Sequence, residues 1–268
     1  VNDSLSKYYA LNINTGELLW QESNDTNLIS KVKIDKDRFY AIDSNNDITC
    51  FDLKNGKKIW TFNTENSLIK SQKKLSIVLD NERVYFNNSN GEIYSLDKNT
   101  GRLLWLIPLR DTSILTKSFF HKTSRLVLEN DNLYFSNNQN SFFSLNKKNG
   151  LINWKQNINS DFMPVISNNF IFTVNYEGYL FVIDKRNGNI IRINDLLKNL
   201  SPKKRSKIKI SGFTLSDKAI YLSLNNGKIL ELNIANAKQS SMLSVGGKEL
   251  SKPFINNKHL FVIKSKIS

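Results

Sequence analysis

The chain has 268 residues, and 40% of them are hydrophobic, including 16 Phe and 9 Tyr. This content suits one closed all-β domain with a large core, and only 4 Pro and 11 Gly exclude a collagen-like or disordered chain. The net charge is +14, but Lys and Arg are spread along the chain and do not form one stripe, so we do not expect nucleic-acid binding.

The start of the chain and its single cysteine do not decide in which cellular compartment the protein is found. No run of about 18 apolar residues is present that could span a membrane. Val1 is not followed by a charged and then apolar leader, so we expect a processed mature chain or a fragment. Cys50 has no partner for an intrachain disulfide, which fits the cytoplasm and the periplasm equally well.

An eleven-residue motif recurs six times along the chain. In its first four copies, a Trp lies four residues after a turn glycine, and these are the four tryptophans of the chain. The pairs are Gly16 and Trp20, Gly56 and Trp60, Gly101 and Trp105, and Gly150 and Trp154. The fifth copy keeps Gly188 but ends in Arg192, and the sixth has Ala237 and Ser241 at these places. Successive turn positions lie 40, 45, 49, 38 and 49 residues apart, a period typical of a four-stranded repeat unit.

Each place in the motif has a physical reason. Asp or Asn at the third place can accept a hydrogen bond from the backbone two residues on and so start a turn. Gly at the seventh place supplies the positive φ that closes a hairpin with a bulge. A small residue at the first place, such as Ala10 or Cys50, leaves room for a wide ring. We expect the Trp ring to use that room and to bury on the order of 200 Å² between neighbouring sheets.

A second hairpin precedes four copies of the motif. Apolar and polar residues alternate over 83–96 around the turn Asn88–Gly91, and the same pattern recurs at 133–145, 170–183 and 219–232. Each unit is therefore predicted to form four successive antiparallel strands with the Trp strand outermost, which is a β-propeller blade. The predicted units are 31–62, 75–106, 124–155, 165–192, 208–243, and 1–24 with 252–268.

The last of these units combines the two ends of the chain. The segment 259–263 is typical of an inner strand without outer partners, and 8–20 supplies outer strands without inner ones. Pairing them would complete a sixth blade and remove both open edges. We predict a single propeller domain over 1–268 with six blades, closed by its terminal segments. If the chain is a fragment, the ring would have seven or eight.

The motif resembles the tryptophan-docking repeat of the PQQ-like β-propeller family over residues 5–243. The resemblance implies that each Trp stacks between blades and holds the ring together. Members of the family include large quinoprotein dehydrogenases and shorter non-enzymatic propellers, among them the BamB-type lipoproteins of bacterial outer-membrane assembly. The resemblance implies the fold and says little about chemistry, because one fold carries many functions.

The residues do not support catalysis or a cofactor. A quinoprotein enzyme, as the resemblance implies it, is a much longer eight-bladed chain with a calcium ion, an Asp base and often a vicinal Cys pair. This chain has 268 residues and one Cys. His121 and His259 lie far apart without a nearby Cys, so the sequence gives no zinc ligand set.

One segment imitates the start of a calcium-binding loop. Asp43, Asn45 and Asp47 have the required spacing. However, Ile48 stands where the loop needs Gly, and Lys54 stands where a Glu should chelate. We therefore predict a polar hairpin turn there and no metal.

Two insertions interrupt the repeat, and inserted loops of a propeller are usual places for binding. Leu106–Ser124 is a long connection that contains the candidate partner-binding residues Arg110, Phe119 and Phe120. Asp195–Lys209 is predicted to form a short helical turn that Asp195 caps and Pro202 ends. The basic candidates Lys203, Lys204 and Arg205 follow it. The alternative is that the apolar residues only anchor these loops and that the cations are solvated.

The resemblance implies a monomeric, non-catalytic scaffold that binds a protein, such as a component of β-barrel assembly, through loops and strand edges. Its place would be the periplasm or the periplasmic face of the outer membrane. The alternative function is a sensor propeller related to quinoproteins, which binds a small ligand in its central channel. A third hypothesis, nucleic-acid binding by the basic surface, predicts salt-sensitive retention on DNA or heparin.

Overall fold

The structure is a computed structural model that describes residues 6–65, 74–109, 122–198, 200–246 and 249–264. These residues form two compact units, the N-terminal unit of 1–139 with 143–153 and the C-terminal unit of 140–142 with 154–268. The described secondary structure is β-strand except for one four-residue helix.

The first three sheets along the chain comprise ten strands. They are β1 (Lys7–Leu11) with β2 (Leu18–Ser23); β3 (Lys33–Asp35), β4 (Arg38–Ile42), β5 (Ile48–Asp52) and β6 (Lys58–Phe62); and β7 (Ile77–Leu79), β8 (Arg83–Asn87), β9 (Glu92–Asp97) and β10 (Leu103–Pro108).

The later sheets comprise fourteen strands and follow the same plan. They are β11 (Val127–Glu129), β12 (Asn132–Asn137), β13 (Ser141–Asn146) and β14 (Ile152–Gln156); β15 (Val165–Ser167), β16 (Phe170–Val174), β17 (Tyr179–Asp184) and β18 (Ile190–Asp195); β19 (Ile210–Leu215), β20 (Ala219–Leu224), β21 (Lys228–Asn233) and β22 (Gln239–Ser244); and β23 (Phe254–Asn256) with β24 (His259–Phe261). The helix α1 (Pro202–Arg205) lies between β18 and β19.

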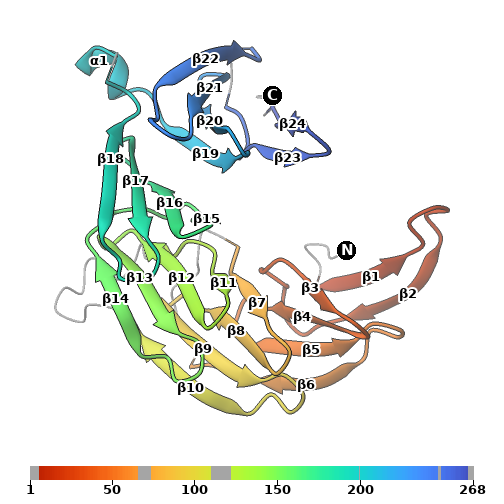
Figure 1. The fold of residues 1–268 in the computed structure, drawn as a ribbon. Coiled ribbons are helices and arrows are strands. Elements are labelled where there is room, and N and C mark those ends of the chain that lie inside the picture. Colours follow the sequence, from red (N-terminus) through yellow and green to blue (C-terminus); the bar gives the residue numbers. More distant parts are fainter. Residues whose placement is uncertain (1–5, 66–73, 110–121, 199, 247–248, 265–268) are drawn as a thin grey trace. The chain divides into compact units, whose positions relative to one another are not determined.

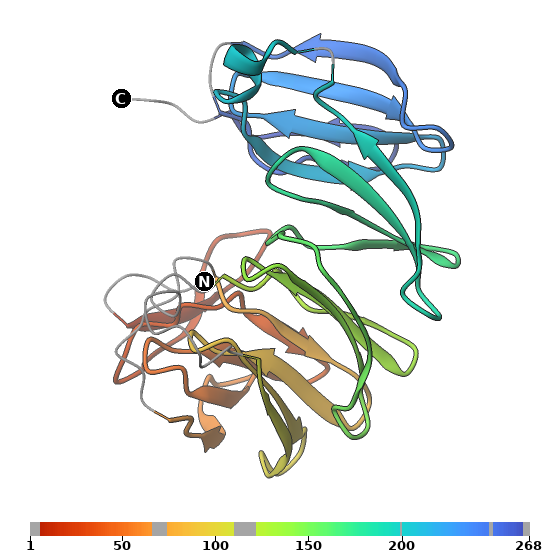
Figure 2. The same ribbon diagram turned by 90° about the vertical axis from the view of Figure 1, so that its left-hand side faces the viewer.

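The predicted blades are confirmed for five units. Each of the repeats from 31–62 to 208–243 forms one four-stranded sheet whose strands follow chain order from edge to edge (Figures 1 and 2). The Trp place lies on the outermost strand of each sheet, namely β6, β10, β14, β18 or β22. The chain therefore has the four-stranded antiparallel blades of a β-propeller.

The terminal strands form two separate sheets, β1 with β2 and β23 with β24. Among the described strands, no pairing joins β1–β2 to β23–β24. The closure of a sixth blade by the chain ends, and the single domain over 1–268, therefore stay predictions.

The turns of the motif have the predicted geometry. The five turn glycines have φ between 73° and 78°, and Ala237 adopts φ 52° at the same place in the sixth copy. In all six copies the third-place Asp or Asn accepts a hydrogen bond from the backbone N–H two residues on, at 2.7 to 3.0 Å. The pairing of the two strands that flank the turn shifts register by a bulge, for example between Cys50 and Phe51. These local bonds explain why the motif forms a hairpin wherever it occurs.

The apolar core is divided into clusters between consecutive sheets. One cluster joins β4 and β5 to β8 and β9 through fully buried Tyr40, Ile48 and Phe86. A second joins β8 and β9 to β12 and β13, and a third, in the C-terminal unit, joins β16 and β17 to β20 and β21. Packing between sheets is therefore the main source of burial in each unit.

The predicted docking of the Trp rings on the next sheet is confirmed. Each indole N–H donates to a backbone carbonyl in the next copy of the motif, at the residue after its third-place Asp or Asn. The pairs are Trp20 with Leu53, Trp60 with Lys98, Trp105 with Lys147, and Trp154 with Lys185, at 3.0 to 3.2 Å. The ring also covers the turn glycine of that copy so closely that a Cβ there would lie 2.6 to 3.0 Å from it. The glycine is thus needed for contact as well as for its positive φ.

The fifth copy keeps the same docking without a Trp. Arg192 is half-buried at the Trp place, and its guanidinium donates to the carbonyl of Ile234, 2.9 Å away, and to that of Ala235. Ile234 follows the third-place Asn233, so it is the equivalent of the carbonyl that each Trp uses. A planar guanidinium with several N–H donors can therefore replace an indole at this junction.

Candidate interaction surfaces

The second insertion differs from its prediction. Asp195 ends β18 instead of capping a helix, although it accepts a hydrogen bond from the N–H of Leu197 at 2.9 Å. The helix α1 begins at Pro202, which we predicted would end it. The physical reason is that proline lacks an N–H and has a fixed φ, both of which suit the first helical position. A hydrogen-bonded turn does follow Asp195, with the N–H of Leu200 donating to the Leu197 carbonyl at 3.0 Å, so the prediction was wrong in ending the helix at Pro202.

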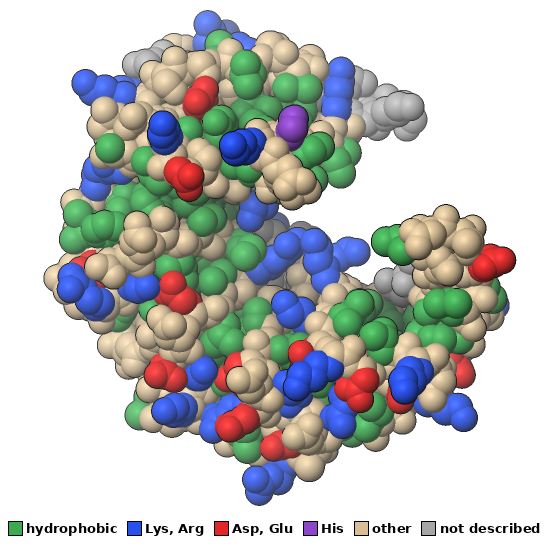
Figure 3. Space-filling view, turned by 45° about the vertical axis from the view of Figure 1, so that its right-hand side comes forward, with side chains coloured by type: hydrophobic (Ala, Val, Ile, Leu, Met, Phe, Trp, Pro, Cys, Tyr) green, Lys and Arg blue, Asp and Glu red, His purple; other side chains and the backbone are tan. Residues whose placement is uncertain are grey.

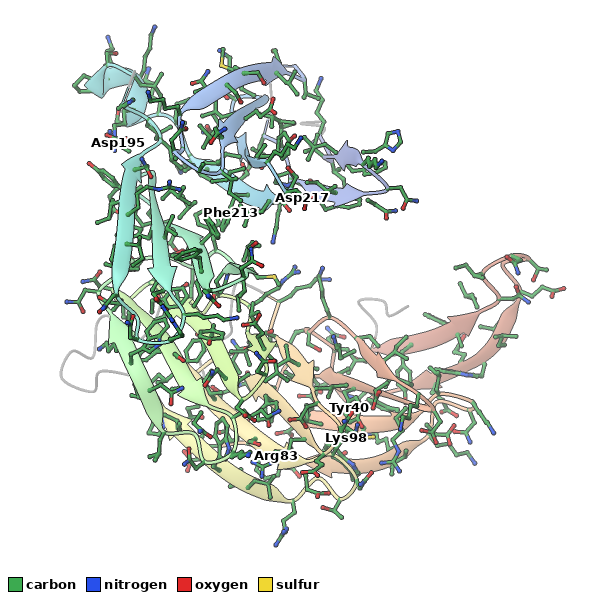
Figure 4. The ribbon with its side chains drawn as sticks, viewed as in Figure 1. Tyr40, Arg83, Lys98, Asp195, Phe213 and Asp217 are labelled. Atoms are coloured by element: carbon green, nitrogen blue, oxygen red, sulfur yellow. The ribbon has the colours of Figure 1, made fainter. Side chains whose placement is uncertain are left out.

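Arg205 fixes α1 to the sheet below it. Its guanidinium forms an ion pair with Asp195 at 2.6 Å, donates to the carbonyl of Glu177 at 2.8 Å and lies 5.2 Å from the centre of the Tyr179 ring. Figure 4 labels Asp195 at the end of β18. The hydrogen bond with Asp195 raises the pKa of Arg205 above its usual value. Of the three basic candidates, Arg205 therefore has a structural role in positioning the helix.

Lys203 and Lys204 are exposed on α1, and Lys207 and Lys209 are exposed just after it. Because α1 is held by Arg205, these ammonium groups occupy a fixed region beside β18. We name this surface the α1 basic surface. Arg110, Phe119 and Phe120, the candidates of the first insertion, lie outside the described residues, as does His121.

An apolar cavity of about 520 Å³ lies beside β1, where sequence reasoning predicted no site. Trp20, Phe39 and the exposed Val32 and Ile34 contribute to its lining. Tyr8 also lines the cavity, and its side chain is buried. The Tyr8 hydroxyl already donates a hydrogen bond to the carbonyl of Gly56 at 2.9 Å. Burial, and then the charge of Glu22, raise the pKa of Tyr8 to about 12. The cavity thus offers apolar contact and little that could hold a charged cofactor.

The Asp43–Asp47 segment is a polar hairpin turn, as predicted. The Asp43 carboxylate accepts hydrogen bonds from the N–H groups of Asn45 and Asp47 and from the Thr26 hydroxyl, at 2.6 to 3.1 Å. Its oxygens are therefore used within the turn. Over the described residues, no group of three or more His, Cys, Asp or Glu side chains could hold a metal ion.

Several cations within the N-terminal unit join neighbouring sheets. Lys98 pairs with Asp35 at 2.8 Å, and Arg83 donates to the carbonyls of Lys147 and Lys148; Figure 4 labels Lys98 and Arg83. On the face drawn in Figure 3, Lys and Arg side chains are scattered among acidic, polar and apolar ones. Some of the positively charged side chains therefore serve to hold neighbouring sheets together.

Sequence reasoning also missed three exposed cations, Lys31, Lys74 and Arg125, that precede the inner strands β3, β7 and β11. Lys31 and Arg125 each lie 25 residues before a turn glycine, Gly56 and Gly150, and Lys74 lies 27 residues before Gly101, so the repeat relates their positions although none of them belongs to the motif. In the described part of the chain, no helix is long and apolar enough to span a membrane.

Comparison with known proteins identifies one family model that matches the chain. The sequence profile described as outer membrane protein assembly factor BamB matches residues 2–194. No curated protein matches the chain.

Three solved structures illustrate the likeness of the fold. BamB from Moraxella catarrhalis has a TM-score of 0.80 at 17% identity, covering 98% of this chain and 77% of that chain. The computationally designed Ika8 protein has a TM-score of 0.74 at 11% identity, covering 97% and 76%. The quinohemoprotein alcohol dehydrogenase ADHIIG from Pseudomonas putida HK5 has a TM-score of 0.64 at 10% identity, covering 85% and 44%. At such identities the likeness shows the fold alone.

Proposed function

Because the chain belongs to the family described as outer membrane protein assembly factor BamB, we propose that it is a non-catalytic scaffold of the bacterial cell envelope. Its partner would be a protein component of outer-membrane β-barrel assembly, met at the periplasmic face of that membrane. The family match over residues 2–194 is the observation that carries this proposal.

The use of the repeat residues supports a scaffold. The four Trp rings, Arg192 and the turn glycines other than Gly16 are used in joining one sheet to the next. Because these side chains are used in packing, the loops that connect the sheets remain available for a partner. The packed sheets hold those loops in fixed positions. Such preorganised loops lose little conformational entropy on binding.

The α1 basic surface is the part of the described chain that we assign to partner contact. Lys203 and Lys204 are exposed, and Arg205 holds their helix against β17 and β18. Exposed lysines at a fixed place favour a partner with an acidic patch, because complementary charge speeds and orients association.

Site-specific photocrosslinking in cells tests this assignment. A photoreactive residue at Lys203 should crosslink to a β-barrel assembly protein, whereas one at Lys54, which is also an exposed lysine but lies on a motif turn, should not. Arg205→Ala should reduce the yield from position 203 by releasing α1. A chain that fractionates with the cytoplasm, or crosslinks that are equal at both positions, would overturn the proposal.

The quinoprotein-like alternative has weaker support. The likeness to the quinohemoprotein alcohol dehydrogenase covers 44% of that chain at 10% identity. Among the residues that the structure describes, no carboxylate lines the cavity beside β1, and the one side-chain amide in its lining, that of Asn12, already accepts hydrogen bonds from the N–H groups of Asn14 and Thr15. Native mass spectrometry of the purified chain should accordingly find no bound small molecule, and a stoichiometric ligand would favour the alternative.

A further inference from the structure

The inner strands of three consecutive sheets begin close together in the N-terminal unit. The strand β7 lies next to both β3 and β11. The start of β11 is tied to the start of β7 by a hydrogen bond from the N–H of Leu126 to the Ser76 hydroxyl, at 3.0 Å. Both of these residues are buried, so the backbone on which the neighbouring side chains stand is fixed.

A cation stands two or three residues before each of these strands. Arg125 adjoins Leu126, Lys74 lies two residues before Ser76, and Lys31 lies two residues before β3. All three side chains are exposed. Within the described ranges, no ion pair links them to a carboxylate, whereas Lys58, Lys98 and Lys147 in the same unit each have an acidic partner.

The three charges are close enough to act on one another. Arg125 is the largest cause that lowers the pKa of Lys31, ahead of burial, and Lys74 lowers it further. Like charges that face each other disfavour the protonated form of an amine. The three cations therefore act on one another electrostatically, and none of them has an ion-paired carboxylate among the described residues.

We propose that Lys31, Lys74 and Arg125 together form a binding site for a phosphoryl group. A guanidinium offers a planar pair of donors for two oxygens of a phosphate, and two ammonium groups act as point charges on the remaining ones. The three cations precede three neighbouring strands, and so small a number of charges suits one multivalent oxyanion better than an extended nucleic-acid backbone. The group could belong to a free phosphate or to a lipid headgroup. This inference does not depend on the proposed function.

Calorimetry with inorganic pyrophosphate at low ionic strength tests the site in the full chain. The wild type should bind one equivalent. Lys31→Gln and Arg125→Gln should each weaken binding at least tenfold, while Arg125→Lys should keep part of the affinity. Lys57→Gln is the matched control, because Lys57 is exposed on a motif turn of the same unit and its replacement removes the same charge. Unchanged circular dichroism and melting temperature would verify that the variants fold.

A second arm distinguishes the two sources of the phosphoryl group. Cosedimentation with phosphatidylglycerol vesicles that is absent for phosphatidylcholine vesicles, and lost in Arg125→Gln, would assign a lipid headgroup. Saturable pyrophosphate binding without cosedimentation would assign a free phosphate. If the wild type binds neither probe, or if Lys57→Gln weakens binding as much as Arg125→Gln, the inference is wrong. As an independent readout, pyrophosphate should slow the acetylation of Lys31 and leave that of Lys57 unchanged.

Discussion

The contact between a Trp ring and the next turn glycine makes a quantitative prediction for Gly101→Ala. Gly101 has φ +73°, and a Cβ there would lie 2.6 and 2.7 Å from two atoms of the Trp60 ring. Gly16 provides a matched control, since it has φ +75° at the same place in the motif but nothing described within 4 Å of a new Cβ. The two substitutions share the backbone cost and differ in the ring contact.

The magnitude follows from these two parts. An alanine in the left-handed region costs about 1–2 kcal/mol. Reduced entropy of the unfolded chain offsets about 0.4–1 kcal/mol of this. Gly16→Ala should therefore lower the free energy of unfolding by about 1 kcal/mol. Gly101→Ala adds the cost of overpacking, about 1–3 kcal/mol, because Trp60 is itself held by the Lys98 carbonyl. Its total should be about 2–4 kcal/mol.

Urea denaturation followed by Trp fluorescence and by circular dichroism measures both variants. In a Trp60→Leu background, the extra cost of Gly101→Ala should fall to the value found for Gly16→Ala, because the ring that causes the clash is gone. Equal destabilisation by Gly16→Ala and Gly101→Ala, or no change in the Trp60→Leu background, would refute the view that this ring packs against Gly101.

Other predictions concern the fifth junction and two buried groups. Arg192→Leu should destabilise the chain by about 1.5–3 kcal/mol through the loss of charged hydrogen bonds, whereas Arg192→Trp should restore stability in the same urea assay; a Trp variant weaker than the Leu variant would contradict this. Burial raises the pKa of Cys50 to about 11, so a thiol reagent at about pH 8 should label it only in urea, and rapid native labelling would count against its burial. The pKa of Tyr8 is raised to about 12, so its contribution to stability is complete below the unfolded value of about 10 and is lost as the pH rises toward 12. Alkaline denaturation midpoints should therefore fall more steeply in the wild type than in Tyr8→Phe, and parallel curves would disprove the shift.

Features that repeat within a few residues could be predicted from the sequence. The turn at Asn12–Gly16 and its five counterparts depends on bonds between neighbours in the chain, so the pattern contains the whole cause. The blades follow because hairpins in sequence pair with their neighbours. The role of Trp60 could be predicted as well, because a small residue, Cys50, stands opposite it in the strand pair.

Features that depend on contacts between distant residues could not be predicted in this way. The start of α1 was misplaced because Pro202 was taken as a helix end, although proline also suits the first helical position. The attachment of α1 through Arg205 to Asp195 and the Tyr179 ring is a set of contacts that no local pattern encodes. The part played by Arg192 was also hidden, because the motif marks its place as degraded while its guanidinium uses the carbonyl that a Trp would use.

The same distinction explains why the repeat is a poor guide to partners. A motif residue such as Trp60 or Gly101 is engaged by the adjacent sheet, so a scaffold and an enzyme can share it without sharing chemistry. Residues that bind a ligand must lie at positions that the packing of the repeat does not use. Lys203 on α1 and Arg125 before β11 lie at such positions. Arg125 and Lys31 each lie 25 residues before a turn glycine but outside the motif, and the structure places the strands that follow them on either side of β7. Substitutions outside the motif should therefore alter binding with little effect on stability, and substitutions inside it should do the reverse.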